Sequence, residues 1–438
     1  MRFFMKPLEV LNDKFTNTDK NRRDFHQVAN QKIAHAKQHH HRIGLLLINL
    51  DNFQSININY GQSIGDKLLL ETHERLASCL SAEDFISRID GDEFVIILGN
   101  ITTAKEAQAA IRKLLKCFKI KYSLDGTSAR IHASIGAAYY PHAGKDSHAL
   151  LESVAICMLH AKSLGGNNCQ HYSEKLRKKH QKESYLENAL KFALENKELF
   201  LTYQPIFNLP TKEMVGMEAL LRWRHPILGL VPPDVFIGLA EKNGLIATIG
   251  EWALQVVCKQ AKEWYNTGYN HFKISFNISS NQLLQKSFPQ KMMTTFKDTL
   301  IPSHLLDIEL TETAFLTHAS YFETILKKMA KTGIGITIDD FGTGHSSLLR
   351  LKNLPIRALK IDKSFVLNIT PHSFNAIIVN SLINLGGKLG LNVIAEGIET
   401  NADLQFLINN GCLQGQGYYL CKPLNAKQMT TFLKKNKK

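Results

Sequence analysis

Short apolar runs in the second half of the chain repeatedly end at or beside a residue that can bind a cation or a phosphate. The polar residues that close these runs are Asn277, Glu309 with Glu312, Asp339 with Asp340, Lys360 with Asp362, and Glu396. Neighbouring runs are spaced by about one strand and one helix, which predicts a barrel of alternating strands and helices. Such a barrel delivers the ends of its strands to one rim. Several carboxylates would meet there, and their natural partner is a hard divalent cation. The pattern therefore favours a metal cluster that activates water against a phosphate ester.

The first half of the chain has a different pattern, with apolar runs that alternate less regularly with helical stretches. The predicted strands cover residues 43–50, 85–89, 93–98 and 130–139. The predicted helices cover residues 65–80, 103–119 and 147–164. Two of the strands flank Asp90-Gly91-Asp92, and an Asp-Gly pair between short apolar runs indicates a hairpin. Together these elements predict an α/β sandwich of usual domain size.

The two halves are joined by a polar segment, residues 173–184, which is rich in Lys, Glu and Gln. This composition predicts an exposed helical connector. Ser184 and Glu187 have the spacing of a capping box, which predicts that a separate helix begins there and runs to Asn196. The expected domains are residues 10–172, the connector 173–184, and residues 185–435.

Composition narrows the class of protein. With 44% hydrophobic and 21% charged residues over 438 positions, the chain has the composition of a soluble globular protein. It lacks an apolar run of the ~20 residues that a membrane span needs, and it has no signal-peptide pattern. Its seven cysteines are scattered, which fits a reducing compartment, so we expect a cytoplasmic protein.

The net charge of +14 suggests an anionic partner. Much of the excess lies in residues 175–182 and 434–438, without interleaved aromatic residues. This arrangement favours solvated helix faces and a polar tail over a surface for a nucleic-acid polymer. A small substrate that carries phosphate would also suit the sign of the charge.

The second half contains an ordered set of motifs. In chain order they are Tyr203-Gln204-Pro205-Ile206, Glu218-Ala219-Leu220-Leu221-Arg222-Trp223, Asn277, Glu309 with Glu312, Asp339-Asp340-Phe341-Gly342-Thr343-Gly344, Lys360-Ile361-Asp362, Glu396-Gly397-Ile398-Glu399 and Gln416-Gly417-Tyr418. This set resembles the EAL family of cyclic di-GMP phosphodiesterases over about residues 185–435. A lone Glu-Ala-Leu would occur by chance in any helix, whereas the ordered set is specific. The resemblance implies a TIM-like (β/α)8 barrel.

The resemblance also implies roles for individual residues. The implied ligands of two Mg²⁺ or Mn²⁺ ions are Glu218, Asn277, Glu309 and Asp339 for the first ion, with Asp340 for the second. The implied catalytic residues are Glu396 as base or water-positioner, Lys360 beside the attacking water or a phosphate oxygen, and Glu312 as support for the loop after Asp340. The implied substrate-binding residues are Arg222, Gln204, Leu220 and Gln416. One departure is His345, where the family usually has tyrosine; it concerns loop dynamics or dimer coupling rather than metal binding.

The hairpin motif of the first half has supporting matches around it. The matching positions are Asp90-Gly91-Asp92-Glu93-Phe94, Asn21-Arg22-Arg23, Asp51 with Phe53, Asn57, Gly61, Gly65-Asp66 and Ala161-Lys162. They resemble the GGDEF family of diguanylate cyclases over about residues 10–172, which implies a nucleotidyl-cyclase-like α/β sandwich.

Several positions depart from that family. The substituted positions are Asn49 for a metal-binding Asp, Gln54 for a phosphate-binding Lys, Asp90 for the first signature Gly, Ile58 for an Asp, Gly166 for an Arg, and Ser81 for the Arg of the product-inhibition motif. A neutral amide is a poorer ligand for a hard cation than a carboxylate. We therefore expect a degenerate domain that makes no cyclic di-GMP. The residues that remain for binding GTP are Asn57, Asp66, Asp92, Glu93 and Lys162. A structural remnant that mediates dimerisation is an equal alternative.

The resulting hypothesis is a phosphodiesterase that converts cyclic di-GMP to linear pGpG, regulated by GTP at the first domain, by homodimer contacts, or by another protein. Three alternatives stay open: a non-catalytic cyclic di-GMP receptor, a bifunctional cyclase and phosphodiesterase, and a general metal-dependent nuclease. A lost metal ligand would favour the receptor, and no ligand position is substituted. The substitutions in the first half argue against cyclase activity. An assay with linear oligonucleotides would distinguish a general nuclease from a cyclic di-GMP phosphodiesterase.

Overall fold

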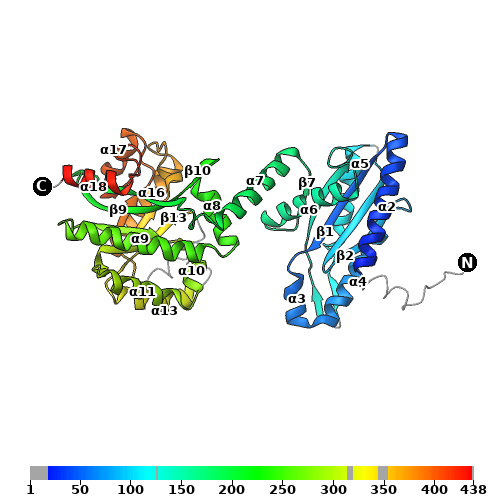
Figure 1. The fold of residues 1–438 in the computed structure, drawn as a ribbon, viewed down its shortest axis with the longest axis horizontal. Coiled ribbons are helices and arrows are strands. Elements are labelled where there is room, and N and C mark those ends of the chain that lie inside the picture. The colour runs from blue at the N-terminus through cyan, green and yellow to red at the C-terminus, as the bar shows by residue number, and fades with distance from the viewer. Residues whose placement is uncertain (1–17, 102, 125–126, 313–318, 344–353, 437–438) are drawn as a thin grey trace, which may run out of the picture. The chain divides into compact units, whose positions relative to one another are not determined.

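The protein is described by a computed structural model that covers residues 18–101, 103–124, 127–312, 319–343 and 354–436 (Figure 1). The chain forms two compact units, Met1–Ser184 and Tyr185–Lys438, which we describe separately. Within the described residues, none of the helices combines the length and apolar character needed to cross a membrane.

The first unit contains a five-stranded sheet with strand order β2-β3-β1-β6-β7. Its strands are β1 (Arg42–Leu50), β2 (Phe85–Asp90), β3 (Glu93–Ile101), β6 (Ala133–Tyr140) and β7 (Cys169–His171), and a separate hairpin is formed by β4 (Tyr122–Leu124) and β5 (Thr127–Ala129). Its helices are α2 (Thr18–His39), α3 (Phe53–Tyr60), α4 (Gln62–Ser78), α5 (Ala104–Cys117) and α6 (Ser147–Ser163). The predicted hairpin is present, because β2 pairs with β3 in antiparallel register around Gly91.

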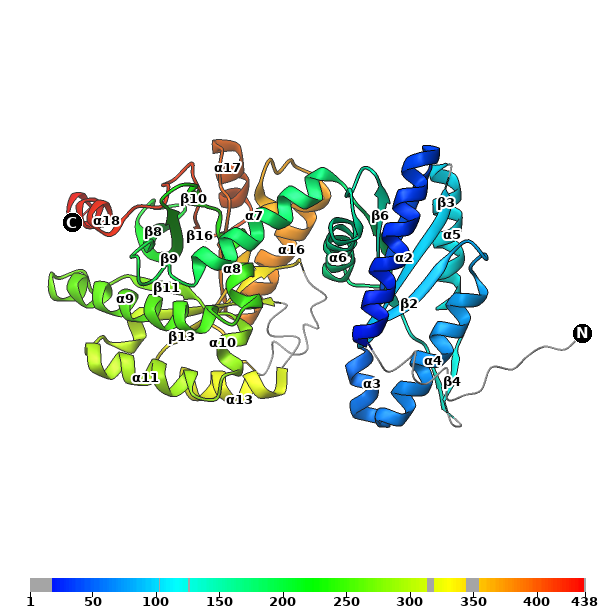
Figure 2. The same ribbon diagram turned by 45° about the vertical axis from the view of Figure 1, so that its right-hand side comes forward.

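Strand β1 explains why this sheet is covered on both faces. Its alternate residues enter different cores: Leu46 and Ile48 pack in a cluster with residues of α4 and α5. Leu45 and Leu47 pack with residues of α2 and α6. Side chains alternate across a strand, so a continuous apolar run is expected where both faces are buried. Figure 2 shows the two helix pairs on opposite faces of the sheet. The predicted α/β sandwich is confirmed.

The connector differs from the prediction. A single helix, α7, spans Glu174–Leu190, so Ser184 lies inside it and caps nothing. The helix begins instead after Ser173, whose hydroxyl accepts a hydrogen bond from the amide of Leu176 at 3.2 Å. The predicted capping box is therefore wrong. Ser184 and Glu187 have the spacing of a capping box, but a helix does not begin there. Leu186 and Leu190, one turn apart, are buried on one face of the same helix, and this packing favours a continuous helix through Ser184.

The second unit is a closed barrel. Its strands are β8 (Leu199–Asn208), β9 (Met214–His225), β11 (Lys273–Asn277), β12 (Leu306–Thr311), β13 (Gly335–Phe341), β14 (Ala358–Ile361), β15 (Asn392–Ala395) and β16 (Gln414–Gly415), and β10 (Gly229–Val231) extends the sheet beside β9. Its helices are α8 (Pro233–Lys242), α9 (Ile246–Asn266), α10 (Ser280–Leu284), α11 (Phe288–Thr299), η1 (Ser303–Leu305), α13 (Ala319–Ala330), α15 (Lys363–Val366), α16 (Phe374–Leu389), α17 (Asn401–Asn409) and α18 (Ala426–Lys435). Pairing of β8 with both β9 and β16 closes the sheet.

One strand departs from an all-parallel barrel. Strand β8 is antiparallel to both of its neighbours, β9 and β16. The other barrel strands, β9 and β11 through β16, pair in parallel, so they run in one direction. Their carboxyl ends therefore meet at one rim, as the polar ends of the apolar runs predict. The barrel fold is confirmed, with β8 reversed.

Candidate metal site and its surroundings

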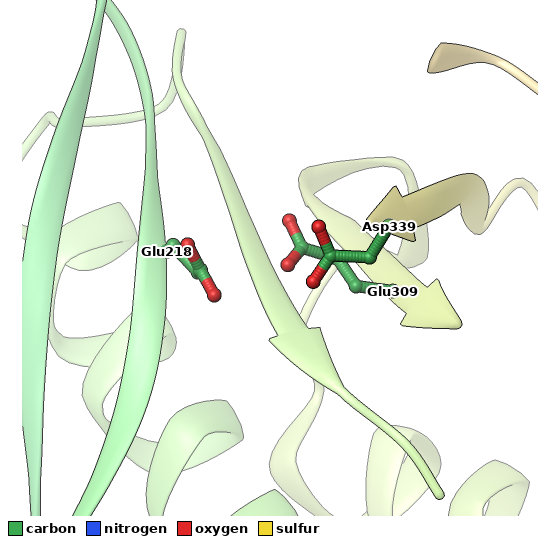
Figure 3. Close-up of side chains that lie close together, drawn as sticks. All are labelled: Glu218, Glu309 and Asp339. Atoms are coloured by element: carbon green, nitrogen blue, oxygen red, sulfur yellow. The ribbon is translucent and has the colours of Figure 1, made fainter. Parts of the chain in front are cut away.

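Three carboxylates converge at the rim of the barrel. Glu218 comes from the middle of β9, Glu309 from β12 and Asp339 from β13. Each offers one oxygen, and these oxygens lie within 4.8 Å of one another. Figure 3 shows the carboxylates of Glu309 and Asp339 together, facing that of Glu218 across the barrel. The parallel register staggers these two acids along their strands, since Asp339 pairs with Thr311, two residues beyond Glu309.

Lys360 lies at the centre of this group. Its Nζ is 2.8 Å from Glu309 Oε2, 3.1 Å from Glu218 Oε2 and 3.3 Å from Asp339 Oδ1. A fourth carboxylate, Glu396, directly follows β15 and lies 2.6 Å from the same Nζ. The lysine side chain is fully buried, so solvent screens none of these contacts. One positive charge thus holds four carboxylates together.

The pKa shifts of these groups indicate that one lysine does not balance the cluster. Burial, followed by the nearby charge of Glu218, holds the pKa of Glu309 well above its usual value. Burial also raises the pKa of Glu396 to about 8, against the opposing effect of Lys360. Burial lowers the pKa of Lys360, but the carboxylates outweigh it and keep that pKa well above its usual value. The cluster therefore holds excess negative charge, or protons in its place.

A divalent cation fits this excess. The donors are carboxylate oxygens, with the amide of Asn277 beside them, and hard cations such as Mg²⁺ and Mn²⁺ prefer such ligands. A second group, formed by Asp339, Asp340 and Glu396, also offers oxygens within 4.8 Å of one another. Burial, and then the charge of Asp339, raises the pKa of Asp340 to about 6, so it too would gain from a neighbouring cation. The residues present fit one or two such ions.

Two amides orient the carboxylates. Asn277, at the end of β11, donates from Nδ2 to Glu218 Oε1 at 2.8 Å. Gln416 donates from Nε2 to Glu218 Oε2 at 2.6 Å and to Glu396 Oε1 at 2.9 Å. Gln416 Oε1 is buried and has no hydrogen-bond partner among the described residues. The amide oxygen therefore keeps its capacity to accept a hydrogen bond.

The backbone after β13 is held in an unusual conformation. Asp340 has φ 52°, in the left-handed region that non-glycine residues seldom adopt, and Gly342 has φ 101°. The amide of Gly342 donates to Glu312 Oε2 at 2.8 Å, so Glu312 anchors the start of the loop. Gly344 and His345 lie outside the described residues.

A cavity of about 360 Å³ opens beside the carboxylates. Among its lining residues are Asn277, Asp339, Asp340, Leu220 and Arg222. It therefore brings five of the predicted site residues to one surface. Its far wall is apolar and comes from α8 and α9, through Ile237, Ile246 and Ile249. That wall was not predicted, because single apolar residues on two helices form no motif.

Arg222 and Gln204 are placed differently with respect to this cavity. Arg222 is half-buried, which lowers its pKa, and its Nη1 donates to the carbonyl of Leu221 at 2.8 Å. Among the described residues, no further hydrogen bond engages its other guanidinium donors. Gln204 is buried and does not line the cavity; its Nε2 donates to the carbonyl of Cys421 at 3.2 Å. Arg222 therefore lines the cavity, whereas Gln204 binds the backbone at Cys421, after Gly417.

In the first unit, Asn49 contacts two acids of the β2–β3 hairpin. This buried residue near the end of β1 directs its Nδ2 to Asp92 Oδ1 at 3.1 Å and, more loosely, to Glu93 Oε1 at 3.4 Å. Burial raises the pKa of Glu93, while Asn49 and Lys162 act in the opposite direction. A neutral donor therefore satisfies the two hairpin acids.

The predicted guanine contacts lie between two helices. Asn57 is on α3, and its Oδ1 is buried with no hydrogen-bond partner among the described residues. A β-carbon on Gly65 would lie 1.9 Å from that oxygen, so a side chain there would displace the Asn57 amide. Asp66 is the next residue on α4 and is exposed, as is Lys162 on α6. Gly166, which follows α6, has φ 73°. A β-carbon at this position would lie 2.8 Å from Asp51 Oδ2.

Comparisons with known proteins agree with this arrangement. One family model, described as EAL domain, matches residues 187–423, and another, described as Diguanylate cyclase, GGDEF domain, matches residues 11–168. The chain is 39% identical over 400 residues to the bifunctional diguanylate cyclase/cyclic di-GMP phosphodiesterase MucR of Pseudomonas aeruginosa, which covers 91% of this chain and 58% of MucR. It is 34% identical over 414 residues to the cyclic di-GMP phosphodiesterase NbdA of the same organism, covering 94% of this chain and 53% of NbdA.

A solved structure is similar over about half of this chain. The PaMucR phosphodiesterase in complex with c-di-GMP has a TM-score of 0.55 and 40% identity, covering 56% of this chain and 99% of that chain. The carboxylate rim on a barrel and the family match define the class: the chain belongs to the EAL domain family and carries a GGDEF domain ahead of the EAL domain. It spans less than two-thirds of the length of MucR and NbdA.

Proposed function

We propose that the EAL domain is a metal-dependent phosphodiesterase that hydrolyses cyclic di-GMP to linear pGpG. The observation that carries this proposal is the group of four carboxylates around Lys360, which opens onto a cavity lined by Arg222. A receptor that only bound the ligand would not need three buried acids and a fourth, half-buried one at this cost in desolvation. MucR and NbdA are both named as cyclic di-GMP phosphodiesterases, which supports the same substrate for this chain.

Glu218, Asn277, Glu309 and Asp339 would hold the first cation, and Asp339, Asp340 and Glu396 a second. Bound Mg²⁺ or Mn²⁺ lowers the pKa of water and neutralises charge that develops on the phosphate. Arg222 binds a phosphate oxygen of the substrate. Glu396, oriented by Gln416, accepts the proton of the attacking water, and Lys360 balances the carboxylates between turnovers. Glu312 keeps the loop after Asp340 in place through Gly342.

Purified protein incubated with cyclic di-GMP, followed by chromatography, tests this function. Glu218→Ala removes an oxygen ligand and should abolish pGpG formation. Glu396→Gln should slow turnover by orders of magnitude while substrate binding, measured by calorimetry with Ca²⁺, is kept. Glu195→Ala, an exposed acid on the barrel unit, is the matched control. Unchanged turnover in excess EDTA, or binding with no pGpG in Mg²⁺ or Mn²⁺, would refute hydrolysis and favour the receptor alternative. Cleavage of linear oligonucleotides at equal rate would favour a general nuclease.

We further propose that the GGDEF domain is degenerate and makes no cyclic di-GMP. The hydrogen bonds from Asn49 to the hairpin acids support this, because they occupy those acids with an uncharged group. Loss of a metal-binding carboxylate and of cationic side chains that bind phosphate should reduce cyclase turnover by more than ~10⁴-fold. MucR is named bifunctional, so a cyclase activity is the second candidate. Incubation of the Glu218→Ala variant with GTP decides between them, because any cyclic di-GMP formed there would accumulate.

A regulatory role for GTP completes the proposal. The unpartnered oxygen of Asn57 and the exposed carboxylate of Asp66 support recognition of a guanine edge. Weak triphosphate contacts would give an affinity in the micromolar-to-millimolar range. We expect added GTP to change the phosphodiesterase rate of the intact protein and to leave the Asn57→Ala/Asp66→Ala variant unaffected. A GTP response that survives both substitutions would place recognition elsewhere.

The remaining proposals concern assembly and location. We propose a cytoplasmic homodimer that can also respond to a protein regulator, with cyclic di-GMP rather than a nucleic-acid polymer as its substrate. Light scattering with and without GTP measures the oligomeric state, and a chain that stays monomeric at assay concentration refutes the dimer.

A further inference from the structure

Two cysteines that are far apart in the sequence meet in the first unit. Cys79 directly follows α4, and Cys117 is the last residue of α5. They lie 38 positions apart, yet their Sγ atoms are 2.7 Å from each other. Both are free thiols. A disulfide bond joins sulfur atoms at roughly 2.05 Å, so the two sulfurs need to approach by less than about 1 Å.

The surrounding contacts hold the two helix ends in this position. Arg75, one turn before Cys79, donates from Nη1 to the carbonyl of Ile120 at 2.9 Å and from Nη2 to that of Lys121 at 2.8 Å. Lys113 on α5 donates from Nζ to the carbonyl of Cys79 at 2.7 Å. Contacts made by Arg75 on α4 and Lys113 on α5 thus hold the two helix ends together, so the proximity of the sulfurs does not depend on one side chain.

The two thiols have different environments, which gives them different roles. Cys79 is partly exposed, whereas Cys117 is buried, with a relative exposure of 8%. Burial raises the pKa of the Cys117 thiol to about 12, and the guanidinium of Arg75 acts against that shift. A small oxidant therefore reaches Cys79 first, because Cys79 is the more exposed of the two cysteines.

We propose that Cys79 and Cys117 form a reversible oxidation site that closes to an intramolecular disulfide when the protein meets a peroxide. The Cys79 thiol gives up its proton as its sulfur attacks one peroxide oxygen, the O–O bond breaks, and the leaving hydroxide takes up that proton, so the products are a sulfenic acid and water. The sulfur of Cys117 then attacks the sulfenic sulfur, and the hydroxyl leaves as a second water with the Cys117 proton. In sum, two thiols are oxidised to one disulfide while one hydrogen peroxide is reduced to two waters. A dithiol reductant reverses the step by exchange.

The test is peptide mapping of the intact, fully reduced chain after treatment with hydrogen peroxide and alkylation of the remaining thiols. Trypsin places Cys79 in a peptide of residues 76–88 and Cys117 in a peptide of residues 117–119. We expect these two peptides to be joined, to separate with dithiothreitol, and to be unlinked in Cys79→Ser and in Cys117→Ser. The matched control is Cys169→Ser, which changes another half-buried cysteine of the same unit and should leave the linked peptide in place.

Thermal unfolding gives a second measurement. A bond that closes a loop of this length should raise the midpoint of the first unit by roughly 5–10 °C in the oxidised parent, and by nothing in the two serine variants. Excess peroxide that leaves both thiols free to alkylation, or that links Cys79 to another cysteine or to a second chain, would overturn the proposal.

Discussion

Replacing Lys360 by methionine tests whether this residue compensates the charge of the carboxylate cluster. Methionine retains most of the apolar stem of the lysine, so the change chiefly removes the ammonium group. The parent Nζ makes four carboxylate contacts between 2.6 and 3.3 Å with no exposed surface. Removing one partner of a buried ion pair typically costs about 3–5 kcal/mol. We expect a loss of that size in the free energy of unfolding of the barrel, in EDTA at pH 8.

Protons and cations should each reduce this loss. In the variant the carboxylates would have pKa values raised further above those of the unfolded chain. Such groups stabilise the fold at low pH, and that stability is lost as the pH rises through the folded pKa. The deficit should therefore be smaller at pH 6 than at pH 8. Excess Mg²⁺ should also shrink it, because a divalent cation would replace the missing charge.

Tryptophan fluorescence in urea measures this effect selectively. All three tryptophans lie in the barrel unit, and Trp223 and Trp264 are at most 2% exposed, so their emission reports the unfolding of that unit. Lys388→Met, at an exposed lysine of α16, is the matched control and should unfold with the parent. If Lys360→Met unfolds in EDTA at the same urea concentration as the parent, the lysine does not compensate the cluster and the reasoning fails.

Three further predictions concern single groups. In EDTA the unfolding midpoint should fall as the pH rises from 6 to 9, since Glu396 has a folded pKa of about 8, far above its unfolded value; a Glu396→Gln variant with an equally steep fall would contradict this. Asn49→Asp should place a carboxylate beside Asp92 and destabilise the first unit by about 1–3 kcal/mol, measured by circular dichroism in EDTA. Added Mg²⁺ should reverse that loss, and a variant as stable as the parent in EDTA would argue against the crowding. Gly166→Ala should lower the thermal midpoint more than Gly165→Ala, because both glycines have positive φ but a β-carbon meets a neighbour only at Gly166; equal losses would rule out the close approach.

The sequence predicted the rim of the barrel because the side chains at strand ends follow from local pattern alone. Asn277, Glu309 and Asp339 each close an apolar run, and parallel strands bring such positions together. The same pattern did not predict that Lys360 contacts four acids at once. That contact depends on how far each side chain reaches across the barrel, which spacing in the sequence does not encode. The pairing of Cys79 with a distant cysteine depends likewise on the packing of α4 against α5.

The continuity of α7 through Ser184 affects how the gene can be divided or recombined. The border between the two units falls inside this helix, at Ser184 and Tyr185. A gene fragment that starts at the border would encode a barrel led by fewer than two helical turns, and so short a segment is marginal without packing. Leu186 and Leu190 are buried in the intact protein, so fraying of this short segment would expose apolar surface at the amino terminus. Exchange of whole domains with relatives is therefore best made before Ser173, where the helix has its own cap.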